Sequence, residues 1–586
     1  MKNEVSIVSD LSCWASAAIY LMGLVVLAVN LKEVQVEDAA SYNYASARQS
    51  IRRVETDGLR GKIVDRHGRD LATNRKSLSI VLNAAQFQKN SWRATTDEIE
   101  KEIERVAKCI GQESPLTRKS IERHVSQTLA MPLVVWRDIG EEELARFSEH
   151  DREFPGFKCE ETDERVYPYG SVGSHVIGYV GRDRGESEAG DEKFNFHQLE
   201  MRGRSGLEIY YDSYLRGVSG ERKVLVDARG FAIKDWVVVE SKAGPDLKTT
   251  LDIDIQKAVE KELKGLVGAC VVIDPRDGSV LALASAPSYN PNDFVPILSK
   301  ELYAKYSKDP KKPLLNRASG GAYAPGSTFK TVTALAGLSI GYPQKRTYEC
   351  TGVFKLGGLS LHCARRWGHG DMDMRHALRE SCNPYFCNLG YEIGTNAIIR
   401  AAKTMGLGSK TGIDFGVDIA GVVPDAEWKE AVYHEKWFPG DVTQMAIGQG
   451  MLLVSPLQMA RIAGAIGTGY LVTPRLKADI PTRKQKLPFA EWQLRVVRDG
   501  MEMVVDGGTG KKAKLSSVKV AGKTGTAEIG RGATKRKNTW FIAYAPADDP
   551  VIAVAMVIEN GDSGGGTTAP KVRNVLASIF GDDNEE

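Results

Sequence analysis

The segment YAPGSTFKTVTALAGL contains a serine and a lysine that could form a nucleophile and its base. Ser327 stands three residues before Lys330 at the start of an apolar-periodic helix, so both side chains project from the same face. A serine hydroxyl needs a base to take its proton, and a lysine can be that base when burial or a second cation lowers its pKa. The pattern predicts nucleophilic catalysis. Because Ser-x-x-Lys arises by chance on the order of a few times in a chain this long, the pair alone is weak evidence.

Two more motifs offer groups that such a nucleophile needs. In ALRESCNPYFCNLG, Ser381 and Asn383 could relay a proton and orient an amide substrate, although either could instead cap a helix. The segment VKVAGKTGTAE is an expected edge strand that carries Lys523, Thr524, Gly525 and Thr526. Gly525 would let a substrate backbone approach, and the N–H of Thr526 could point at an oxyanion. The alternative is a glycine bulge with a surface lysine. The three motifs predict one site only when they are taken together, in this order.

Strands and helices far apart in the sequence must bring these motifs together. The stretch KTTLDIDIQKAVEKEL predicts a helix capped by Thr250 or Asp252, and CVVIDPRDGSVLALAS predicts two strands that turn at Asp277 and Gly278. Near the end of the chain, NTWFIAYAPADDPVIAVAMVIE predicts an antiparallel hairpin beside VKVAGKTGTAE. Helical segments lie between these early and late strands. The sequence therefore predicts an α+β domain.

Composition excludes several classes of protein. The chain has 586 residues, of which 42% are apolar and 26% charged, so it is neither collagen-like, nor a disulfide-dense mini-scaffold, nor intrinsically disordered. The formal net charge is only +3, which gives no footprint for nucleic acid, and we expect no nucleic-acid partner. The length allows about three or four domain-sized units.

Residues 11–31 read LSCWASAAIYLMGLVVLAVNL, which contains no charged residue and would form about 30 Å of helix, enough to cross one bilayer core. A buried soluble helix should not stand uncapped at a terminus. A cleaved signal peptide should have a positive n-region, whereas Lys2 is offset by Glu4 and Asp10. We expect a short cytoplasmic tail at residues 1–10, a transmembrane anchor at 11–31 and the bulk of the chain on one side of the membrane.

Residues 32–245 differ in composition from the rest of the chain. They are rich in charge, with short apolar runs such as SLSIVLN between glycine and proline turns, and with the acidic helix-like stretch TTDEIEKEIERVAKCI. In RGKIVDRHGRDLA, residues 65–68 predict a tight turn between two strands. We expect an elongated mixed α/β pedestal over 32–245 and a second domain over 246–586.

The three motifs are the set found in penicillin-binding proteins and class A β-lactamases. Residues 247–579 resemble a penicillin-binding transpeptidase domain, also in NRASGGAYAPGSTFK and AIGQGMLLVSPLQMARIAGAI. The segments RGKIVDRHGRDLATN, RVYPYGSVGSHVIGYVG and GRSGLEIYYDSYLRGVSG are similar to the pedestal of the class B, monofunctional branch, and RRWGHGDMD resembles its elongation-type group, penicillin-binding protein 2. The resemblance implies an antiparallel sheet flanked by helices, with a mostly helical subdomain.

The resemblance also implies a reaction. Ser327 would attack the carbonyl of a D-Ala-D-Ala stem-peptide terminus, Lys330 would accept the serine proton, and Ser381 would relay that proton to the departing D-alanine. An amine from a neighbouring strand would then resolve the acyl-enzyme and form a peptidoglycan cross-link during cell elongation. β-Lactams would acylate the same serine.

Other residues of the motifs would bind the substrate. The resemblance implies that the N–H groups of Ser327 and Thr526 form the oxyanion hole, that Lys523 and Thr524 hold the substrate carboxylate, and that Asn383 orients the peptide amide. No cofactor is required for this chemistry. The expected location is the bacterial cytoplasmic membrane with the bulk outside the cytoplasm, and the expected partner is a polytopic glycan polymerase. The alternative is a membrane-tethered penicillin sensor or β-lactamase of the same fold.

A cluster of thiols accompanies the second motif. Cys350, Cys363, His369 and Cys382 follow one another with twelve, five and twelve residues between them, and they could supply a complete tetrahedral set for a structural zinc ion. The spacing lacks the tight Cys-x-x-Cys of a zinc finger. Elongation-type relatives carry metal-ligand residues at similar places, some with carboxylates instead of cysteine. A Cys350–Cys363 disulfide and unrelated core thiols remain the alternatives.

Overall fold

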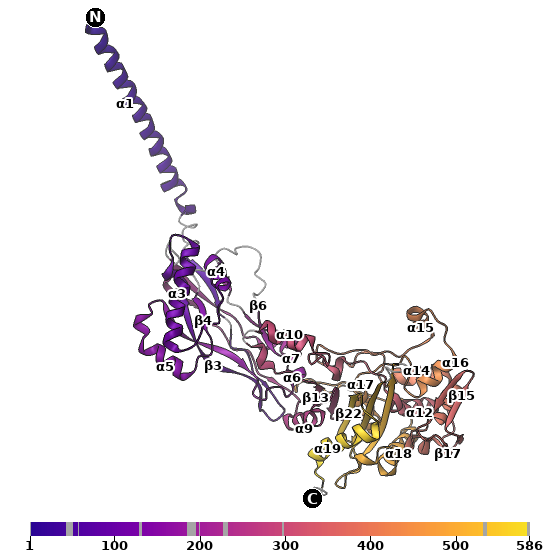
Figure 1. The fold of residues 1–586 in the computed structure, drawn as a ribbon. Helices are drawn as coiled ribbons and strands as arrows, with labels where there is room; N and C mark the ends of the chain where they lie inside the picture. The colour runs from indigo at the N-terminus through magenta and orange to yellow at the C-terminus, as the bar shows by residue number, and fades with distance from the viewer. Residues whose placement is uncertain are drawn as a thin grey trace.

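The N-terminal helix stands apart from the rest of the molecule (Figure 1). The computed structural model describes residues 2–42, 51–56, 58–127, 132–183, 195–197, 200–226, 232–295, 298–530 and 536–582. Helix α1 (Lys2–Lys32) begins within the expected short cytoplasmic tail and runs through the expected anchor, and a short π-helical turn (Glu33–Glu37) extends it. Among the described helices, only the stretch Leu11–Glu37 is long and apolar enough to cross a membrane, with a mean hydropathy of 2.0 and no burial against the protein.

The pedestal between α1 and the C-terminal domain contains two larger sheets. The first has the order β10-β9-β1-β7 and the second the order β11-β2-β3-β4, with β5 paired to the long strand β3. The strands are β1 (Ile51–Thr56), β2 (Ile63–Val64), β3 (Asp70–Asn83), β4 (Pro132–Trp136), β5 (Phe157–Val166), β7 (Asn195–His197), β9 (Gly220–Val226) and β10 (Ala232–Val239). Strand β11 (Leu247–Lys248), which lies just past the expected boundary at residue 245, pairs with β2. The predicted turn at residues 65–68 joins β2 to β3, and Gly68 has a φ of 85°, which glycine adopts without strain.

Some helices of the pedestal pack on its sheets, and others lie next to the C-terminal domain (Figure 1). They are α3 (Trp92–Ile110), α4 (Arg118–Gln127), α5 (Glu141–Glu149), α6 (Ser174–Ile177), α7 (Gly206–Tyr210) and α8 (Asp212–Leu215), with the small strand pair β6 (Val180–Asp183) and β8 (Glu200–Gly203). Helix α3 buries Ile99, Ile103 and Val106 against the β3–β4 sheet. Tyr211 at the end of α7 donates a 2.6 Å hydrogen bond to Asp414, so the pedestal contacts the C-terminal domain directly.

The C-terminal domain is built on a five-stranded antiparallel sheet. Its order is β13-β12-β22-β21-β20, with β12 (Gly268–Ile273), β13 (Val280–Ala286), β20 (Ala521–Ile529), β21 (Arg536–Ala545) and β22 (Ile552–Glu559). The predicted hairpin of β21 and β22 is confirmed, and β20 is an edge strand as expected. Asp252 caps α9 (Ile253–Leu263), as the sequence predicted.

Both faces of this sheet are buried. Along β21, Trp540 and Ile542 pack into the core shared with α12 and α17, while Phe541 and Ala543 pack into the core shared with α9 and α19. This alternation places one layer of helices on each face, because successive strand side chains point to opposite sides. The helices of these layers include α12 (Lys330–Ser339), α17 (Pro456–Thr468), α18 (Glu491–Gly507) and α19 (Ala569–Phe580).

A mostly helical part lies beside the sheet (Figure 1). Its helices are α13 (Met374–Arg379), α14 (Asn383–Thr404), α15 (Ala426–Tyr433) and α16 (Pro439–Ala446), and its small strands are β14 (Tyr348–Cys350), β15 (Val353–Leu356), β16 (Leu359–His362) and β17 (Gly370–Met372). Elsewhere in the domain, α10 (Lys300–Lys308) lies next to the pedestal, α11 (Arg317–Gly320) packs on β12 and β13, and β18 (Tyr470–Val472), paired with β19 (Lys484–Lys486), packs on α17. Helix α14 packs on α12 and on α16, so the first residues of α12 and α14 lie in the same part of the domain.

Candidate active site

The nucleophile candidate lies on a short 3₁₀ turn, Gly326–Phe329, that leads into α12. Gly326 has a φ of 55°, its N–H donates to the carbonyl of Gly448, and a Cβ at this position would lie 2.8 Å from the carbonyl oxygen of Thr526. Only glycine lets the turn approach β20 this closely. Ser327 is therefore held between the loop at Gly448 and the edge strand, and its side chain is half-buried.

Lys330 is completely buried behind Ser327, and its amine contacts the second motif. Its Nζ donates to Asn383 Oδ1 at 2.6 Å and to the carbonyl oxygen of Ser381 at 2.7 Å, and it lies 3.4 Å from Ser381 Oγ. Among the described residues, no hydrogen bond joins this amine to Ser327 in the present state. Burial lowers the pKa of Lys330 to about 8, which makes a substantial neutral fraction available near physiological pH.

The geometry would also suit Lys330 as a base once its amine is neutral. The two short hydrogen bonds to Asn383 and to the Ser381 carbonyl would then use both N–H groups, and the lone pair could accept a hydroxyl proton.

A second buried lysine reaches the same hydroxyl from the edge strand. Lys523 Nζ donates to Ser381 Oγ at 2.9 Å and to the carbonyl oxygen of Thr524 at 3.0 Å. Burial, with a contribution from the positive charge of Lys330, lowers the pKa of Lys523. Ser381 has a φ of 55°, in the left-handed region that non-glycine residues rarely adopt. Such backbone strain concentrates at functional sites, where the surrounding contacts maintain it.

The alternative role of the second motif as a helix cap is wrong. Helix α14 begins at Asn383, its N-cap is Cys382, and no side chain caps it. The side chain of Asn383 instead accepts from Lys330 and donates to the carbonyl of His362 at 2.7 Å. The second motif therefore contributes its side chains to the site.

Strand β20 presents the third motif along the site. A Cβ on Gly525 would lie only 2.9 Å from the carbonyl oxygen of Pro325. Glycine at this position therefore lets β20 pack directly against the turn that carries Ser327. The carbonyl of Thr526 accepts from Gln449 Nε2 at 3.2 Å, and Thr524 Oγ1 lies 2.7 Å from Thr509 Oγ1. Sequence reasoning missed the roles of Gln449 and Thr509, because neither belongs to the three motifs and only the fold brings them to β20.

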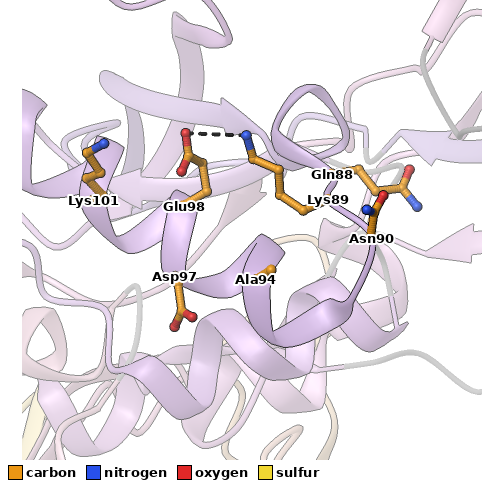
Figure 2. A pocket seen from close by; sticks show the side chains of 7 residues that line it. All are labelled: Gln88, Lys89, Asn90, Ala94, Asp97, Glu98 and Lys101. Carbon is orange, nitrogen blue, oxygen red and sulfur yellow. Dashed lines mark ion pairs between the residues drawn. The ribbon is translucent and has the colours of Figure 1, made fainter.

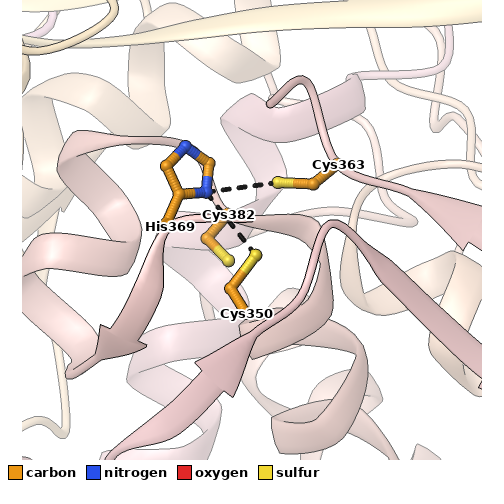
Figure 3. Close-up of side chains that lie close together, drawn as sticks. All are labelled: Cys350, Cys363, His369 and Cys382. Carbon is orange, nitrogen blue, oxygen red and sulfur yellow. Dashed lines mark hydrogen bonds between the residues drawn. The ribbon is translucent and has the colours of Figure 1, made fainter. Parts of the chain in front are cut away.

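Three thiols and one imidazole gather behind the second motif (Figure 3). Their ligand atoms all lie within 4.8 Å of one another, and His369 Nδ1 lies 3.4 Å from the sulfur of Cys363 and 3.6 Å from that of Cys350. The hydrogen bond with Cys382 lowers the pKa of the Cys363 thiol. All eight cysteines are free, so the structure does not form the alternative Cys350–Cys363 disulfide.

Two hollows differ in their relation to this site. One of about 520 Å³ lies in the pedestal between the 88–90 segment and α3, where Lys89 and Glu98 approach to 3.7 Å, and no motif residue lines it (Figure 2). Another of about 380 Å³ lies beside β20, since Gln449 lines it and also hydrogen-bonds Thr526. Lys429 and Asp441 form a 2.8 Å ion pair in its wall.

This fold and this site define a serine acyltransferase of the penicillin-binding class. The penicillin-binding protein transpeptidase domain matches residues 268–577, and the penicillin-binding protein dimerisation domain matches residues 55–249. The chain belongs to the penicillin-binding protein transpeptidase family.

Similar proteins indicate which group of this family the chain resembles. The chain is 32% identical to peptidoglycan D,D-transpeptidase MrdA of Escherichia coli strain K12, over 96% of this chain and 93% of that protein. Its structure is similar to penicillin-binding protein 2 of Helicobacter pylori, solved with MreC, with a TM-score of 0.78 and 28% identity over 90% of this chain and 99% of that one. A chain of a solved peptidoglycan synthase complex matches with a TM-score of 0.73 and 29% identity, over 97% of this chain and 98% of that one. The expected resemblance to the penicillin-binding protein 2 group is confirmed.

Proposed function

We infer that this chain is a peptidoglycan D,D-transpeptidase that cross-links stem peptides through a serine acyl-enzyme during cell elongation. The observation that carries the inference is the convergence of two buried lysines, Lys330 and Lys523, on the hydroxyl of Ser381. The relatives named peptidoglycan D,D-transpeptidase support the same reaction. They also favour it over a penicillin sensor or a β-lactamase, as does the match of the pedestal to the dimerisation domain.

The first step forms the acyl-enzyme. Ser327 Oγ attacks the carbonyl carbon of the penultimate D-alanine while its proton passes to the lone pair of neutral Lys330. The proton then moves through the hydroxyl of Ser381 to the nitrogen of the departing D-alanine. In the second step an acceptor amine attacks the ester, its proton returns along the same groups, and Ser327 is released. β-Lactams acylate Ser327 by the first step.

Residues of the edge strand and of the second motif bind the substrate. Lys523 and Thr524 bind the terminal carboxylate, and the N–H groups of Ser327 and Thr526 bind the developing oxyanion, with Gly525 keeping the strand close to the nucleophile turn. Asn383 orients the peptide amide with the Nδ2 hydrogen that His362 does not use. All these steps use groups of the chain itself, so no cofactor takes part in them.

The cysteine cluster suits a structural zinc ion. Zinc–sulfur bonds of about 2.3 Å and zinc–nitrogen bonds of about 2.0–2.1 Å at tetrahedral angles require sulfur and nitrogen to lie about 3.6 Å apart. The separations of His369 Nδ1 from Cys363 and Cys350 are 3.4 and 3.6 Å, and Cys382 completes the set of four. The ion would take no part in acyl transfer.

Such an ion would stiffen the second motif from behind. Cys382 stands between Ser381 and Asn383 in the sequence, and Cys363 directly follows His362, whose carbonyl accepts from Asn383. Metal bonds to both cysteines would therefore hold the two segments that position Asn383 and Ser381.

The expected setting of the enzyme follows from its substrate. We place residues 11–31 as the anchor in the bacterial cytoplasmic membrane, after a cytoplasmic tail at 1–10, with the pedestal at 32–245 and the transpeptidase domain at 246–586 outside the cytoplasm. The H. pylori relative was solved with MreC, and another relative lies in a peptidoglycan synthase complex that coordinates polymerization and crosslinking. These findings support a polytopic glycan polymerase as partner of this chain.

Intact-protein mass spectrometry after incubation with a penicillin tests the proposal. The wild-type chain should gain the mass of one ring-opened penicillin and keep it for longer than minutes, whereas Ser327→Ala should gain none. Loss of the adduct within seconds would indicate a β-lactamase, and labelling of Ser327→Ala would contradict the assignment of the nucleophile.

A further inference from the structure

Thr509 lies in the turn after α18 and contacts two of the three motifs. Its backbone N–H donates to the carbonyl oxygen of Arg379 at 3.2 Å, two residues before Ser381, and its Oγ1 lies 2.7 Å from Thr524 Oγ1. One residue thus connects the segment that leads into the second motif with the strand that carries the third.

The turn that carries Thr509 is held in place on both sides. The N–H groups of Gly508 and Gly510 both donate to the carbonyl of Val504, which ends α18 in a defined turn. On the opposite side, a Cβ at Gly565 would lie 2.3 Å from the carbonyl oxygen of Thr509, so glycine permits that segment to pack directly on the turn. Thr509 is therefore fixed with respect to Thr524.

The two hydroxyl groups have a limited number of protons to donate. Thr509 Oγ1 can donate to Thr524 Oγ1 at 2.7 Å or to the carbonyl of Arg379 at 3.4 Å, and that carbonyl already accepts the N–H of Thr509. The single proton of Thr524 can go to Thr509 or to a ligand. When a carboxylate binds, the best arrangement has Thr509 donating to Thr524 and Thr524 donating to the carboxylate.

We propose that Thr509 is a positioning residue for the substrate carboxylate, because its hydroxyl donates to Thr524 and turns the proton of Thr524 toward the ligand. The inference rests on the proposed function, in which Thr524 binds that carboxylate. Without ligand, the hydroxyl of Thr524 donates to Thr509, and the hydroxyl of Thr509 donates to the carbonyl of Arg379. Carboxylate binding reverses both, so neither hydroxyl is left without a partner.

The test compares two penicillins that differ only at the carboxylate. The second-order rate of acylation of Ser327 is measured in the full-length protein with a penicillin and with its methyl ester. In Thr509→Val the rate with the free acid should fall about tenfold, equivalent to about 1.4 kcal/mol, while the rate with the ester stays within about twofold of wild type. Thr509→Ser retains the hydroxyl and should restore the ratio of the two rates.

A matched control separates this role from a loss of packing. Thr568→Val removes a 2.8 Å hydrogen bond between two buried threonines, Thr568 and Thr539, and should leave the ratio of acid to ester unchanged. If Thr509→Val does not fold, the ratio is measured in Thr509→Ala. An unchanged ratio in the folded variant, or equal losses with both compounds, would overturn the inference. Failure of the wild-type protein to be acylated at Ser327 would instead contradict the proposed function.

Discussion

Lys523 Nζ donates a 2.9 Å hydrogen bond to Ser381 Oγ, across 142 residues of sequence. This bond joins the edge strand to the segment before α14. Lys330 Nζ donates to the same oxygen from 3.4 Å, so the proton of Ser381 itself stays available for a third group. In the proposed mechanism Ser381 is thus placed to pass a proton from Lys330 to the leaving group, and we expect acyl transfer to depend on this hydroxyl.

Replacing Ser381 by alanine should therefore slow acylation by about 10²- to 10⁴-fold, the usual contribution of general acid–base catalysis. Stopped-flow acylation by a chromogenic β-lactam measures the rate. Ser578→Ala is the matched control, since Ser578 Oγ donates to the carbonyl of Val575 within α19, and it should acylate at the wild-type rate. A Ser381→Ala rate within a factor of about three of wild type would refute the relay.

The backbone conformation of Ser381 gives a prediction about stability. Because its φ of 55° is costly for residues with a Cβ, Ser381→Gly should be more stable than Ser381→Ala by about 1 kcal/mol, although both lose the hydroxyl. Denaturant unfolding of the two variants measures the difference. Greater stability of the alanine variant would show that the left-handed conformation is not maintained in solution.

Acylation should depend on pH through Lys330. Burial lowers its pKa to about 8, and the neutral amine is the base, so the rate should rise with pH below about 8 and level off above it. An arginine stays protonated throughout, and Lys330→Arg should lose both the rate and this ascending limb. The pH profile of the second-order acylation rate measures both. A rate that stays constant from about pH 6 to about pH 9 would contradict the role of Lys330 as base.

Gly525 allows β20 to pack directly against the nucleophile turn. In Gly525→Ala the new Cβ would lie 2.9 Å from the carbonyl oxygen of Pro325 and from Thr328 Cγ2, so the turn must shift. We expect a loss of about 1–3 kcal/mol in unfolding free energy and a strong loss of acylation. Gly358→Ala, where nothing lies within 4 Å of the added Cβ, should change neither. Normal acylation of Gly525→Ala would show that the turn tolerates displacement.

The cysteine cluster predicts a measurable metal content. Purified, dialysed protein should hold about one zinc ion per chain, and a strong chelator should lower both the melting temperature and the acylation rate. Cys363→Ser should lose the ion, whereas Cys159→Ser, at an exposed position on β5, should retain it. Zinc-free protein with two thiols missing from a titration would favour the Cys350–Cys363 disulfide instead.

The elements that carry the short motifs could be predicted from the sequence. Helix α12 begins at Lys330 and Lys523 lies on an edge strand, as expected, whereas Ser327 lies on a 3₁₀ turn just before the helix. Their mutual contacts were not predictable from any one motif. The hydrogen bond between Lys330 and Asn383 depends on how α12 packs on α14, which no local pattern encodes.

Residues outside motifs could not be found in this way. Thr509 belongs to a glycine-rich turn whose sequence predicts only that α18 ends there. Its contact with Thr524 exists because α18 packs beside β20, far along the chain. The alternative of a helix cap for Ser381 failed for the same reason, since a tertiary partner, Lys523, satisfies its hydroxyl.

Exchange of a terminal D-alanine for an amine is the decisive assay for D,D-transpeptidase activity through Ser327. Full-length protein in detergent is given a stem pentapeptide ending in D-Ala-D-Ala and an excess of a D-amino acid, and mass spectrometry follows both products. A D,D-transpeptidase releases one D-alanine for each amine incorporated, and Ser327→Ala should do neither. Release of D-alanine with water alone as acceptor, or amine incorporation by Ser327→Ala, would contradict the proposed reaction.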